Sequence, residues 1–438
     1  MGVTLRRRSL AAVAILATAA LGLVACSKSD DANTGSSSTE QITLNVDVFG
    51  NFGYEELYKK YMQDHPNIKI VERGTGGQLG DFTQQVTQRI AAGSGLGDVL
   101  AVEEGMSIDI KAKGNNFVDL KEYGAAELSG NFLDWKVAGM TTDDGKIIGL
   151  GTDVGGMAMC YRRDLFAKAG LPTDRAEVSA LWKTWDDYIA IGERFKTANT
   201  GASFLDGAPN MFNTILLQAA GNGSGYHYYD LDNKLVVDSN PAVKQAWDTA
   251  MKIIAAGITG KFPQWSTEWV TAFQKGSFAT IACPAWMTGV ISGNAGKDAS
   301  GQWDIASVPG NGGNWGGSFL AVPTQSKHPR EAYELAKFLT SPQGQIGAFK
   351  DKGPLPSSPQ ALDDTAIKDA TNAYFNNAPV GQIFGAGAKS LKPVYMGPRN
   401  QAVRTEVENA VRTVELGQRT PDQGWQEAVA NAKKAAAK

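Results

Sequence analysis

The sequence has few of the residues that build metal centres and nucleophilic active sites, with three cysteines and three histidines among 438 residues. His65 and His328 each precede a proline in a predicted turn, and His227 lies in a tyrosine-rich stretch. A histidine-based metal site or catalytic triad would need these distant positions to converge, so surface histidines are the simpler interpretation. We therefore expect no metal site and no cofactor.

Familiar catalytic and phosphate-binding motifs are also missing. The chain has no G-x-S-x-G, no S-x-x-K, no P-loop and no strict G-x-G-x-x-G. The adjacent carboxylates of Glu103 and Glu104 leave a glycosidase open, because that class needs only two acidic residues at a suitable separation. Acidic residues are too common in this chain for adjacency alone to indicate catalysis.

The chain lacks an excess of charge of either sign. Its formal net charge is −3, with 42 basic and 45 acidic residues intermixed along the sequence. A nucleic-acid-binding protein usually shows a basic patch or stripe. We therefore do not expect a nucleic acid among its partners.

Apolar runs long enough to interact with a bilayer are confined to the N-terminus. Arg6, Arg7 and Arg8 precede the apolar run 10–23, which is the layout of a signal peptide. The tetrad LVAC that ends at Cys26 resembles a bacterial lipobox, in which the cysteine receives a lipid and becomes the first mature residue. The alternative is an ordinary signal peptide whose cleavage region happens to contain a cysteine.

The lipobox interpretation divides the N-terminus into two segments. Residues 1–25 are the expected signal peptide, and residues 26–41 are polar, serine-rich and without periodicity, as a flexible tether is. Lipid on Cys26 would then hold the protein on the extracellular face of the cytoplasmic membrane. The other two cysteines, Cys160 and Cys283, lie in strand-like runs, and on sequence alone a disulfide and two buried thiols remain equally open.

The next segment predicts an α/β fold. Residues 42–48, 68–71 and 98–102 have strand patterns, and helical patterns follow the first two of them. This β-α-β-α-β order predicts right-handed crossovers and a doubly wound parallel sheet. Ligands of such sheets bind outside the carboxyl ends of the strands, which here are the loops 49–54 and 103–106.

Tryptophan is the residue in surplus, with ten in the chain. Trp286, Trp303 and Trp315 stand near glycine or proline and outside helical stripes. Flat rings on loops provide platforms for the apolar faces of sugar rings, whose hydroxyls bond to carboxylates and amides. Packing in a hydrophobic core is the alternative for each ring taken singly. Together they favour a carbohydrate cleft.

Several motifs occur together in an order that resembles the sugar-binding, maltose-binding-protein-like family of extracellular solute-binding proteins of ABC importers. The resemblance runs from Ile42 to the C-terminal helices, and its details are most similar to actinobacterial binders of cellobiose and cello-oligosaccharides. The motifs are SGLGDVLAVE, MCYRRDLFAKAGLP, TWDDYIAIGERF, FQKGSFATIACPAWM, WGGSFLAVP, HPREAYELAKFLTS and GPLPSSP.

The resemblance implies two α/β lobes, with crossing strands at a hinge and a ligand cleft between the lobes. Residues 156–161 and 280–286 would be the crossing strands, so that Cys160 and Cys283 would be neighbours and a disulfide geometrically possible. The implied segments are 42–155 and 284–340 for the first lobe, and 156–283 and 341–438 for the second.

The family's sugar-contacting positions transfer to this chain by motif, from loops of both lobes. Trp185 and Trp269 are expected in the core. The expected ligand-binding residues are Asn51, Phe52, Tyr54, Glu103, Glu104, Asp153, Met211, Phe212, Asn213, Trp265, Trp286, Trp303, Trp315, Gly317, Ser318, Tyr395 and Arg399.

The resemblance implies a monomeric binding protein and no enzyme. It would capture an oligosaccharide, with cellobiose or cello-oligosaccharides expected first, and deliver it to the membrane permease of an ABC importer. Xylo-oligosaccharides, another sugar, a non-sugar solute and a surface glycosidase are the alternatives.

Overall fold

The computed structural model describes residues 40–74, 79–385, 388, 391 and 393–437. The predicted signal peptide and the lipidation of Cys26 lie outside the described residues. Residues 41–438 form one compact unit. None of the helices in the described part of the chain is long and apolar enough to cross a bilayer.

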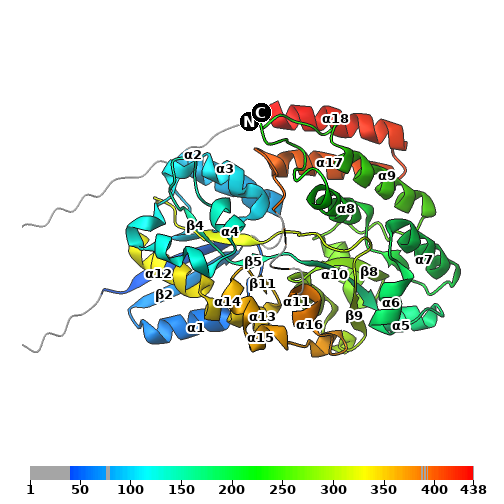
Figure 1. Cartoon of the computed structure of the whole chain (residues 1–438), viewed down its shortest axis with the longest axis horizontal. Coiled ribbons are helices and arrows are strands. Elements are labelled where there is room, and N and C mark those ends of the chain that lie inside the picture. The colour runs from blue at the N-terminus through cyan, green and yellow to red at the C-terminus, as the bar shows by residue number, and fades with distance from the viewer. Residues whose placement is uncertain (1–39, 75–78, 386–387, 389–390, 392, 438) are drawn as a thin grey trace, which may run out of the picture. The chain divides into compact units, whose positions relative to one another are not determined.

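The first sheet has five strands in the order β2-β1-β3-β10-β4. Strands β1, β2 and β3 are parallel, whereas β10 runs antiparallel to both of its neighbours, β3 and β4. The expected β-α-β-α-β unit is thus confirmed, with a later strand inserted beside it; Figure 1 colours this strand yellow among blue and cyan elements. The strand bounds are β1 Ile42–Val48, β2 Ile68–Gly74, β3 Val99–Glu103, β4 Gly149–Gly151 and β10 Ser318–Ala321.

The second sheet has four strands in the order β7-β8-β6-β9, and a separate pair, β11-β5, lies outside both sheets. Strands β6 and β9 are antiparallel partners, and β7 runs parallel to β8. The strand bounds are β5 Asp153–Val154, β6 Met157–Arg162, β7 Ser203–Leu205, β8 Phe278–Pro284, β9 Trp303–Ala306 and β11 Leu355–Pro356.

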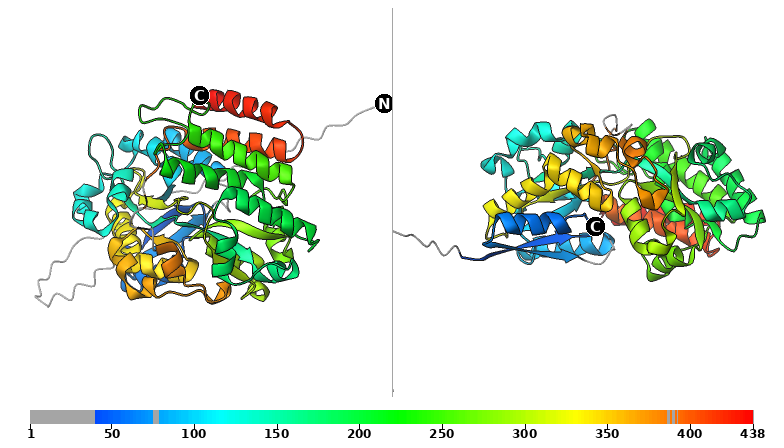
Figure 2. Two further views of the ribbon diagram at one scale, coloured as in Figure 1. Left: turned by 45° about the vertical axis from the view of Figure 1, so that its right-hand side comes forward. Right: turned by 90° about the horizontal axis from the view of Figure 1, so that it is seen from below.

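The helices begin where the sequence supplies caps. Thr184 and Asp187 form the predicted capping box at the start of α7, and the Asn240 side chain caps α9. Figures 1 and 2 show helices around the sheets. The α-helix bounds are α1 Glu55–Asp64, α2 Leu79–Ala92, α3 Ser107–Lys111, α4 Asp134–Gly139, α5 Arg163–Lys168, α6 Arg175–Leu181, α7 Trp185–Thr197, α8 Ala208–Asn222, α9 Pro241–Ala256, α10 Thr267–Lys275, α11 Met287–Ala295, α12 Pro329–Thr340, α13 Pro342–Lys352, α14 Pro359–Asp363, α15 Thr365–Lys368, α16 Val380–Gly385, α17 Asn400–Glu415 and α18 Pro421–Ala437.

Short 3-10 helices fill several of the connections. They are η1 Glu104–Met106, η2 Gly114–Asn116, η3 Leu120–Tyr123, η4 Ala125–Asn131, η5 Lys297–Ala299 and η6 Ala373–Phe375.

Each sheet has a hydrophobic cluster on both faces, because side chains alternate along a strand. In β3, Val99 and Ala101 join one cluster while Leu100 and Val102 join another. In β6, Met159 belongs to the cluster that includes α7, α8 and α17, whereas Cys160 belongs to the cluster with α10 and α11. Two doubly covered sheets therefore form the two lobes, as expected.

Two placements differ from the segments implied by the resemblance. Strand β8 lies beside β6 inside the four-stranded sheet, so both segments expected to cross between the lobes, 156–161 and 280–286, contribute strands to the second sheet. Strand β9, within the range 284–340 expected in the first lobe, pairs with β6 in the second sheet. The chain returns to the first sheet through residues 307–317, which connect β9 to β10.

The structure joins Cys160 and Cys283 in a disulfide. Their sulfur atoms are 2.02 Å apart and their Cα atoms 5.4 Å apart. The two residues are diagonal neighbours on β6 and β8, since Cys160 pairs with Ile281 and Cys283 pairs with Ala158. The bond therefore ties the two central strands of the second lobe.

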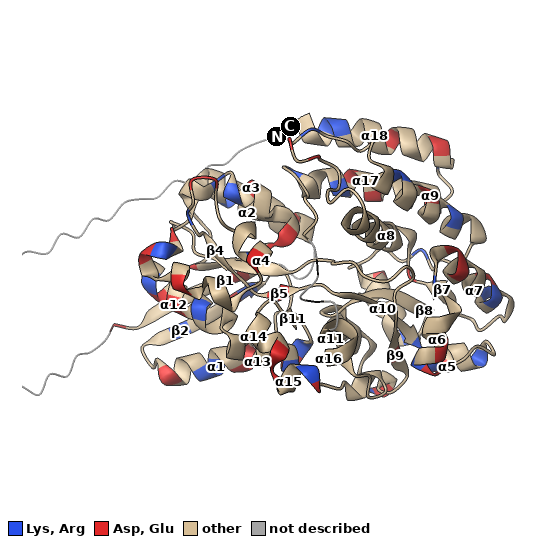
Figure 3. Cartoon of the chain, viewed as in Figure 1, with Lys and Arg blue, Asp and Glu red and all other residues tan. Residues whose placement is uncertain are grey.

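Charged residues of both signs lie interspersed on the outer helices, as Figure 3 shows. This distribution agrees with the intermixed charges of the sequence.

Candidate ligand-binding site

Three predicted carboxylates belong to the first lobe. Glu103 ends β3, and its side chain accepts a hydrogen bond from the Gly105 amide at 2.7 Å. Glu104 begins η1 and accepts from the Asn314 side chain at 3.1 Å. Asp153 begins β5, where its side chain accepts from the Thr152 hydroxyl at 2.6 Å. Glu103 and Glu104 thus lie at the carboxyl end of a parallel strand, where α/β sheets bind ligands.

A lysine that the sequence does not predict as a site residue lies next to the segment that these carboxylates contact. Lys136 of α4 is 1% exposed, and its ammonium donates to the Ser318 carbonyl at 3.4 Å. The ammonium also lies 4.2 Å from the centre of the Phe319 ring. A single lysine on a short helix matches no sequence motif. Its position directly after Trp135 is the one local feature that could have indicated burial.

Burial changes the pKa values of the three carboxylates and of Lys136. It raises the pKa of Glu104 to about 7, and it raises the pKa values of Glu103 and Asp153 as well. The positive charge of Lys136 opposes these shifts, and Arg404 also lowers the pKa of Glu103. Burial in turn lowers the pKa of Lys136, and the three carboxylates counteract that effect.

Three tryptophans form an aromatic group next to the carboxylates. The rings of Trp265 and Trp286 are stacked at 6.1 Å, with an angle of 23° between their planes. Trp286 is perpendicular to Trp315 at 6.3 Å, and its indole nitrogen donates to the Trp315 carbonyl at 3.0 Å. A Cβ added to Gly316 would lie 3.4 Å from that indole nitrogen and 4.0 Å from Glu103 Oε1. The aromatic and acidic groups therefore meet at the segment 315–317.

A second cation reaches this group from the second lobe. The guanidinium of Arg404, on α17, lies 5.6 Å from the centre of the Trp315 ring and donates to Glu408 at 2.7 Å. The sequence predicts Arg399 instead, and the backbone amide of Arg399 donates to Asp109 of α3 at 2.9 Å. Arg404 could have been found as a charged residue next to Val403 and Val407 on the buried stripe of an amphipathic helix.

The loop after β1 lies at the edge of the same region. A small cavity here is lined by Phe52, Tyr54 and Asp153, together with residues of α12 and α13. The Asn51 side chain accepts from the Gly53 amide at 3.0 Å, which fixes the loop. The other lining residues are Thr152, Leu339, Gln345, Ala348 and Pro354.

Several predicted residues lie elsewhere. Trp303 is fully buried on β9 and packs against Phe273 and Phe278, so it belongs to the core of the second lobe. Met211 and Phe212 are also fully buried in a hydrophobic cluster, because the apolar positions of α8 face the core. The positions of these three residues give no support to their predicted contacts with a ligand.

The remaining predicted residues have the following positions. Asn213 is buried on α8. The Tyr395 hydroxyl bonds to the Asn233 side chain, at the tip of a surface hairpin. Trp185 and Trp269 are buried, as expected. Among the residues that the structure describes, no group of three or more histidine, cysteine or acidic side chains is arranged to hold a metal ion.

Comparisons with known proteins agree with this architecture. The arabinooligosaccharide-binding protein of Bacillus subtilis is 26% identical over 303 residues, which are 65% of this chain and 65% of that protein. The lactose-binding protein of Rhizobium radiobacter is 27% identical over 263 residues, 58% of this chain and 57% of that protein. The chain thus spans less than two thirds of the length of these two relatives.

Solved structures match over nearly the whole described chain. The crystal structure of an extracellular solute-binding protein of family 1 is 42% identical, with a TM-score of 0.76, and the match covers 90% of this chain and 100% of that one. The binding protein from B. animalis subsp. lactis in complex with β-1,6-galactobiose shares the fold at 20% identity, with a TM-score of 0.76, over 90% of this chain and 98% of that one. Residues 56–375 match the model of the bacterial extracellular solute-binding proteins, and the chain belongs to that family of binding proteins rather than to an enzyme family.

Proposed function

We propose that this protein captures an oligosaccharide outside the cell and delivers it to the permease of an ABC importer. One observation carries the proposal: Trp286, Trp315 and the buried carboxylates of Glu103 and Glu104 meet along the segment 314–317, which connects the two lobes, and Trp265 stacks on Trp286. Aromatic faces stack on the apolar faces of pyranose rings, while carboxylates accept hydrogen bonds from hydroxyls. Relatives that bind arabino-oligosaccharides, lactose and galacto-oligosaccharides support the sugar class.

Within that class, we propose cellobiose or cello-oligosaccharides as the ligand. The motifs around β6, β8 and segment 314–319 support this choice through their resemblance to cello-oligosaccharide binders. Xylo-oligosaccharides remain the main alternative, since they differ by a hydroxymethyl group on each ring, a difference worth ~1–3 kcal/mol per changed contact.

A thermal-shift screen of the purified chain tests the ligand. Cellobiose and cellotriose are expected to raise the unfolding temperature, whereas maltose, xylobiose and monosaccharides have small effects, because a tight ligand stabilises the folded state by mass action. A shift with xylobiose alone would move the assignment to xylo-oligosaccharides. A flat response to every sugar would contradict the carbohydrate proposal.

A glycosidase would use its carboxylates differently. Glu103 and Glu104 are consecutive on one turn and are held by Gly105 and Asn314, whereas a glycosidase places two carboxyl groups on opposite sides of the scissile bond. Hydrolysis of a chromogenic β-glucoside that is lost in Glu103→Gln would overturn the binding function.

We further propose that lipid on Cys26 anchors the protein as a monomer at the outer face of the membrane. The lipobox-like tetrad and the polar tether at 26–41 support the anchor. Cys26→Ser is expected to move the protein from the membrane fraction to the medium. Equal membrane retention of wild type and variant would contradict the anchor.

A further inference from the structure

Lys136 carries a charge that is almost wholly removed from solvent. A buried ammonium is costly unless the groups around it compensate for its lost hydration. Its hydrogen bond to the Ser318 carbonyl is long, at 3.4 Å, and the rings of Phe319 and Trp135 lie 4.2 Å and 5.2 Å away. These contacts are too weak to balance a full charge, so negative groups nearby must contribute.

The negative groups are the carboxylates of the proposed ligand site. Burial lowers the pKa of Lys136, and the charges of Glu103, Glu104 and Asp153 oppose that shift. The geometry agrees, because Ser318, whose carbonyl accepts from Lys136, pairs with Glu103. Arg404 is the cation that faces Glu103 from the second lobe, and it is also paired with Glu408. Lys136 is therefore the cation that all three carboxylates share.

The backbone is shaped to let the ammonium come close. A Cβ added to Gly317, whose φ is +120°, would lie 2.8 Å from Lys136 Nζ and 2.6 Å from the Asp153 carbonyl oxygen. Only glycine leaves this space open. A residue with a side chain at this position would displace the ammonium from the site.

The same segment connects the lysine to the rest of the site. Ser318 pairs with Glu103 between β10 and β3, and the Glu104 amide donates to the Gly317 carbonyl at 3.0 Å. On the other side, the Thr152 amide donates to the Ser318 carbonyl at 2.9 Å. Lys136 thus contacts the short segment that links the carboxylates to Trp315.

We propose that Lys136 is the positioning residue of the ligand site: its buried charge favours the ionised forms of Glu103, Glu104 and Asp153 as hydroxyl acceptors, and its contact with the Ser318 carbonyl holds the Gly317–Ser318 segment in place. The inference rests on the proposed function. It also defines the ligand class more narrowly: carboxylates outnumber the shared cation, so the site accepts neutral sugars and rejects acidic ones.

The test measures the affinity for cellobiose by calorimetry between pH 5.5 and pH 9. Lys136→Met removes the charge and keeps the approximate shape. At pH 8 we expect at least a tenfold loss of affinity, with a smaller loss at pH 5.5, because without the lysine the carboxylates take up protons at a higher pH. The midpoint of the affinity profile is expected to move up by at least one pH unit. Lys136→Arg, which keeps the charge, should retain the wild-type midpoint.

Controls separate this role from a packing role. Lys111→Met removes a half-buried lysine of α3 in the same lobe and should leave affinity and midpoint unchanged. An equal loss at every pH with an unmoved midpoint would overturn the proposal, as would tighter binding of cellobiouronic acid than of cellobiose.

A double variant tests the same role of Lys136 if Lys136→Met does not fold stably. If Lys136→Met is unstable, Lys136→Met with Glu104→Gln is expected to unfold at a higher temperature than the single variant, because one uncompensated charge has been removed. A double variant that is no more stable contradicts charge balance. If the wild-type protein binds no sugar at any pH, the proposed function fails. The role of Lys136 is then tested by stability alone: between pH 5 and pH 8 the unfolding temperature should fall more steeply in Lys136→Met than in wild type. Parallel curves for the two proteins would overturn that role.

Discussion

The two lobes contribute different chemistry to the proposed ligand site. The first lobe supplies Glu103, Glu104 and Asp153 around Lys136, whereas the second supplies Trp265 and Trp286. Their frameworks differ too, since the second lobe has a disulfide between its central strands. The difference suggests that hydroxyl selection depends on one lobe and apolar contact area on the other. Four predictions test this comparison.

The largest expected effect concerns the framework. Replacing Cys160 and Cys283 by alanine should lower the free energy of unfolding by about 4 kcal/mol, because the bond closes a long loop, of sequence separation 123. Calorimetry should show the loss as an earlier transition of the second lobe, with the first lobe's transition less changed. A single transition shifted as a whole would mean that the lobes unfold together.

The next effect concerns Glu104, whose pKa burial raises to about 7 from 4.5. The folded protein holds this proton more tightly than the unfolded chain, so stability falls as pH rises from about 4.5 to about 7 and is constant above. The fall is on the order of 3 kcal/mol for a shift of this size. Glu104→Gln cannot ionise, and its unfolding temperature should depend less on pH in that window. An unchanged slope would assign the titration to another group.

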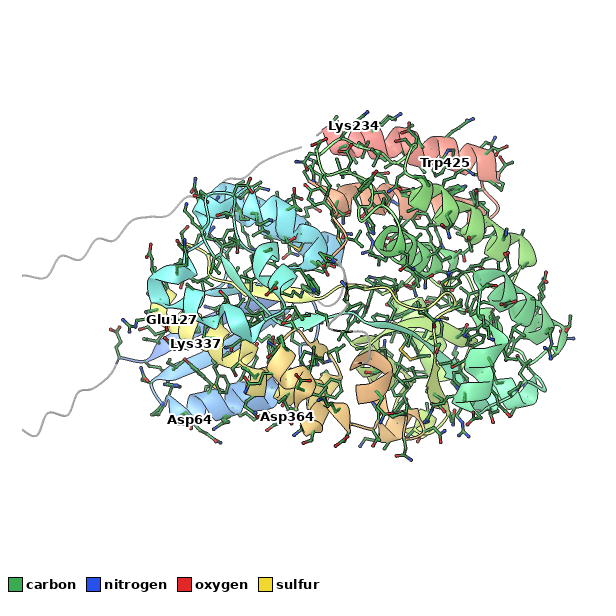
Figure 4. All side chains as sticks on the ribbon, viewed as in Figure 1. Asp64, Glu127, Lys234, Lys337, Asp364 and Trp425 are labelled. Carbon is green, nitrogen blue, oxygen red and sulfur yellow. A yellow bond between two sulfur atoms is a disulfide. The ribbon has the colours of Figure 1, made fainter. Side chains whose placement is uncertain are left out.

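Trp286 tests the apolar half of the site. Trp286→Ala should weaken cellobiose binding about 100-fold, equivalent to about 3 kcal/mol, since a stacking surface is lost together with its contact to Trp265. Trp425→Ala is the matched control, because Trp425, labelled on α18 in Figure 4, packs on Trp247 away from the proposed site. Equal losses in the two variants would indicate a general effect of removing tryptophan.

The smallest effect is expected at Trp303. Trp303→Phe should change cellobiose affinity less than twofold while lowering the unfolding temperature, because this ring is in the core of the second lobe. Titration of both proteins with cellobiose checks it. A large loss of cellobiose affinity with an unchanged unfolding temperature would show that Trp303 contacts the ligand.

Features that depend on local sequence could be predicted. The first strand follows from its alternation of apolar and polar residues, and the capping box at Thr184 follows from short-range hydrogen bonding. The position of Glu103 follows from the apolar run that it ends. The nearby Gly301 predicts a loop around Trp303, whereas the structure places Trp303 at the start of β9, a strand buried along its whole length.

Features that depend on distant contacts could not be predicted from the residues alone. Lys136 meets Ser318 across 182 positions, and Asn314 meets Glu104 across 210. Arg404 reaches Trp315 from a C-terminal helix. No periodicity or spacing along the chain encodes such pairs, because they arise only after the sheets have formed.

The position of β10 has a consequence for how the chain is made. This strand, at 318–321, lies between β3 and β4, which end at residues 103 and 151. When only the first 317 residues have emerged from the ribosome, β3 still lacks its partner β10 and has an unpaired edge. The pairing of β10 with β3 joins residues far apart in the sequence, and pairings of this kind form slowly. The first lobe can be completed only after most of the polypeptide has been synthesised, which gives an exported chain time to be threaded through a membrane before it folds.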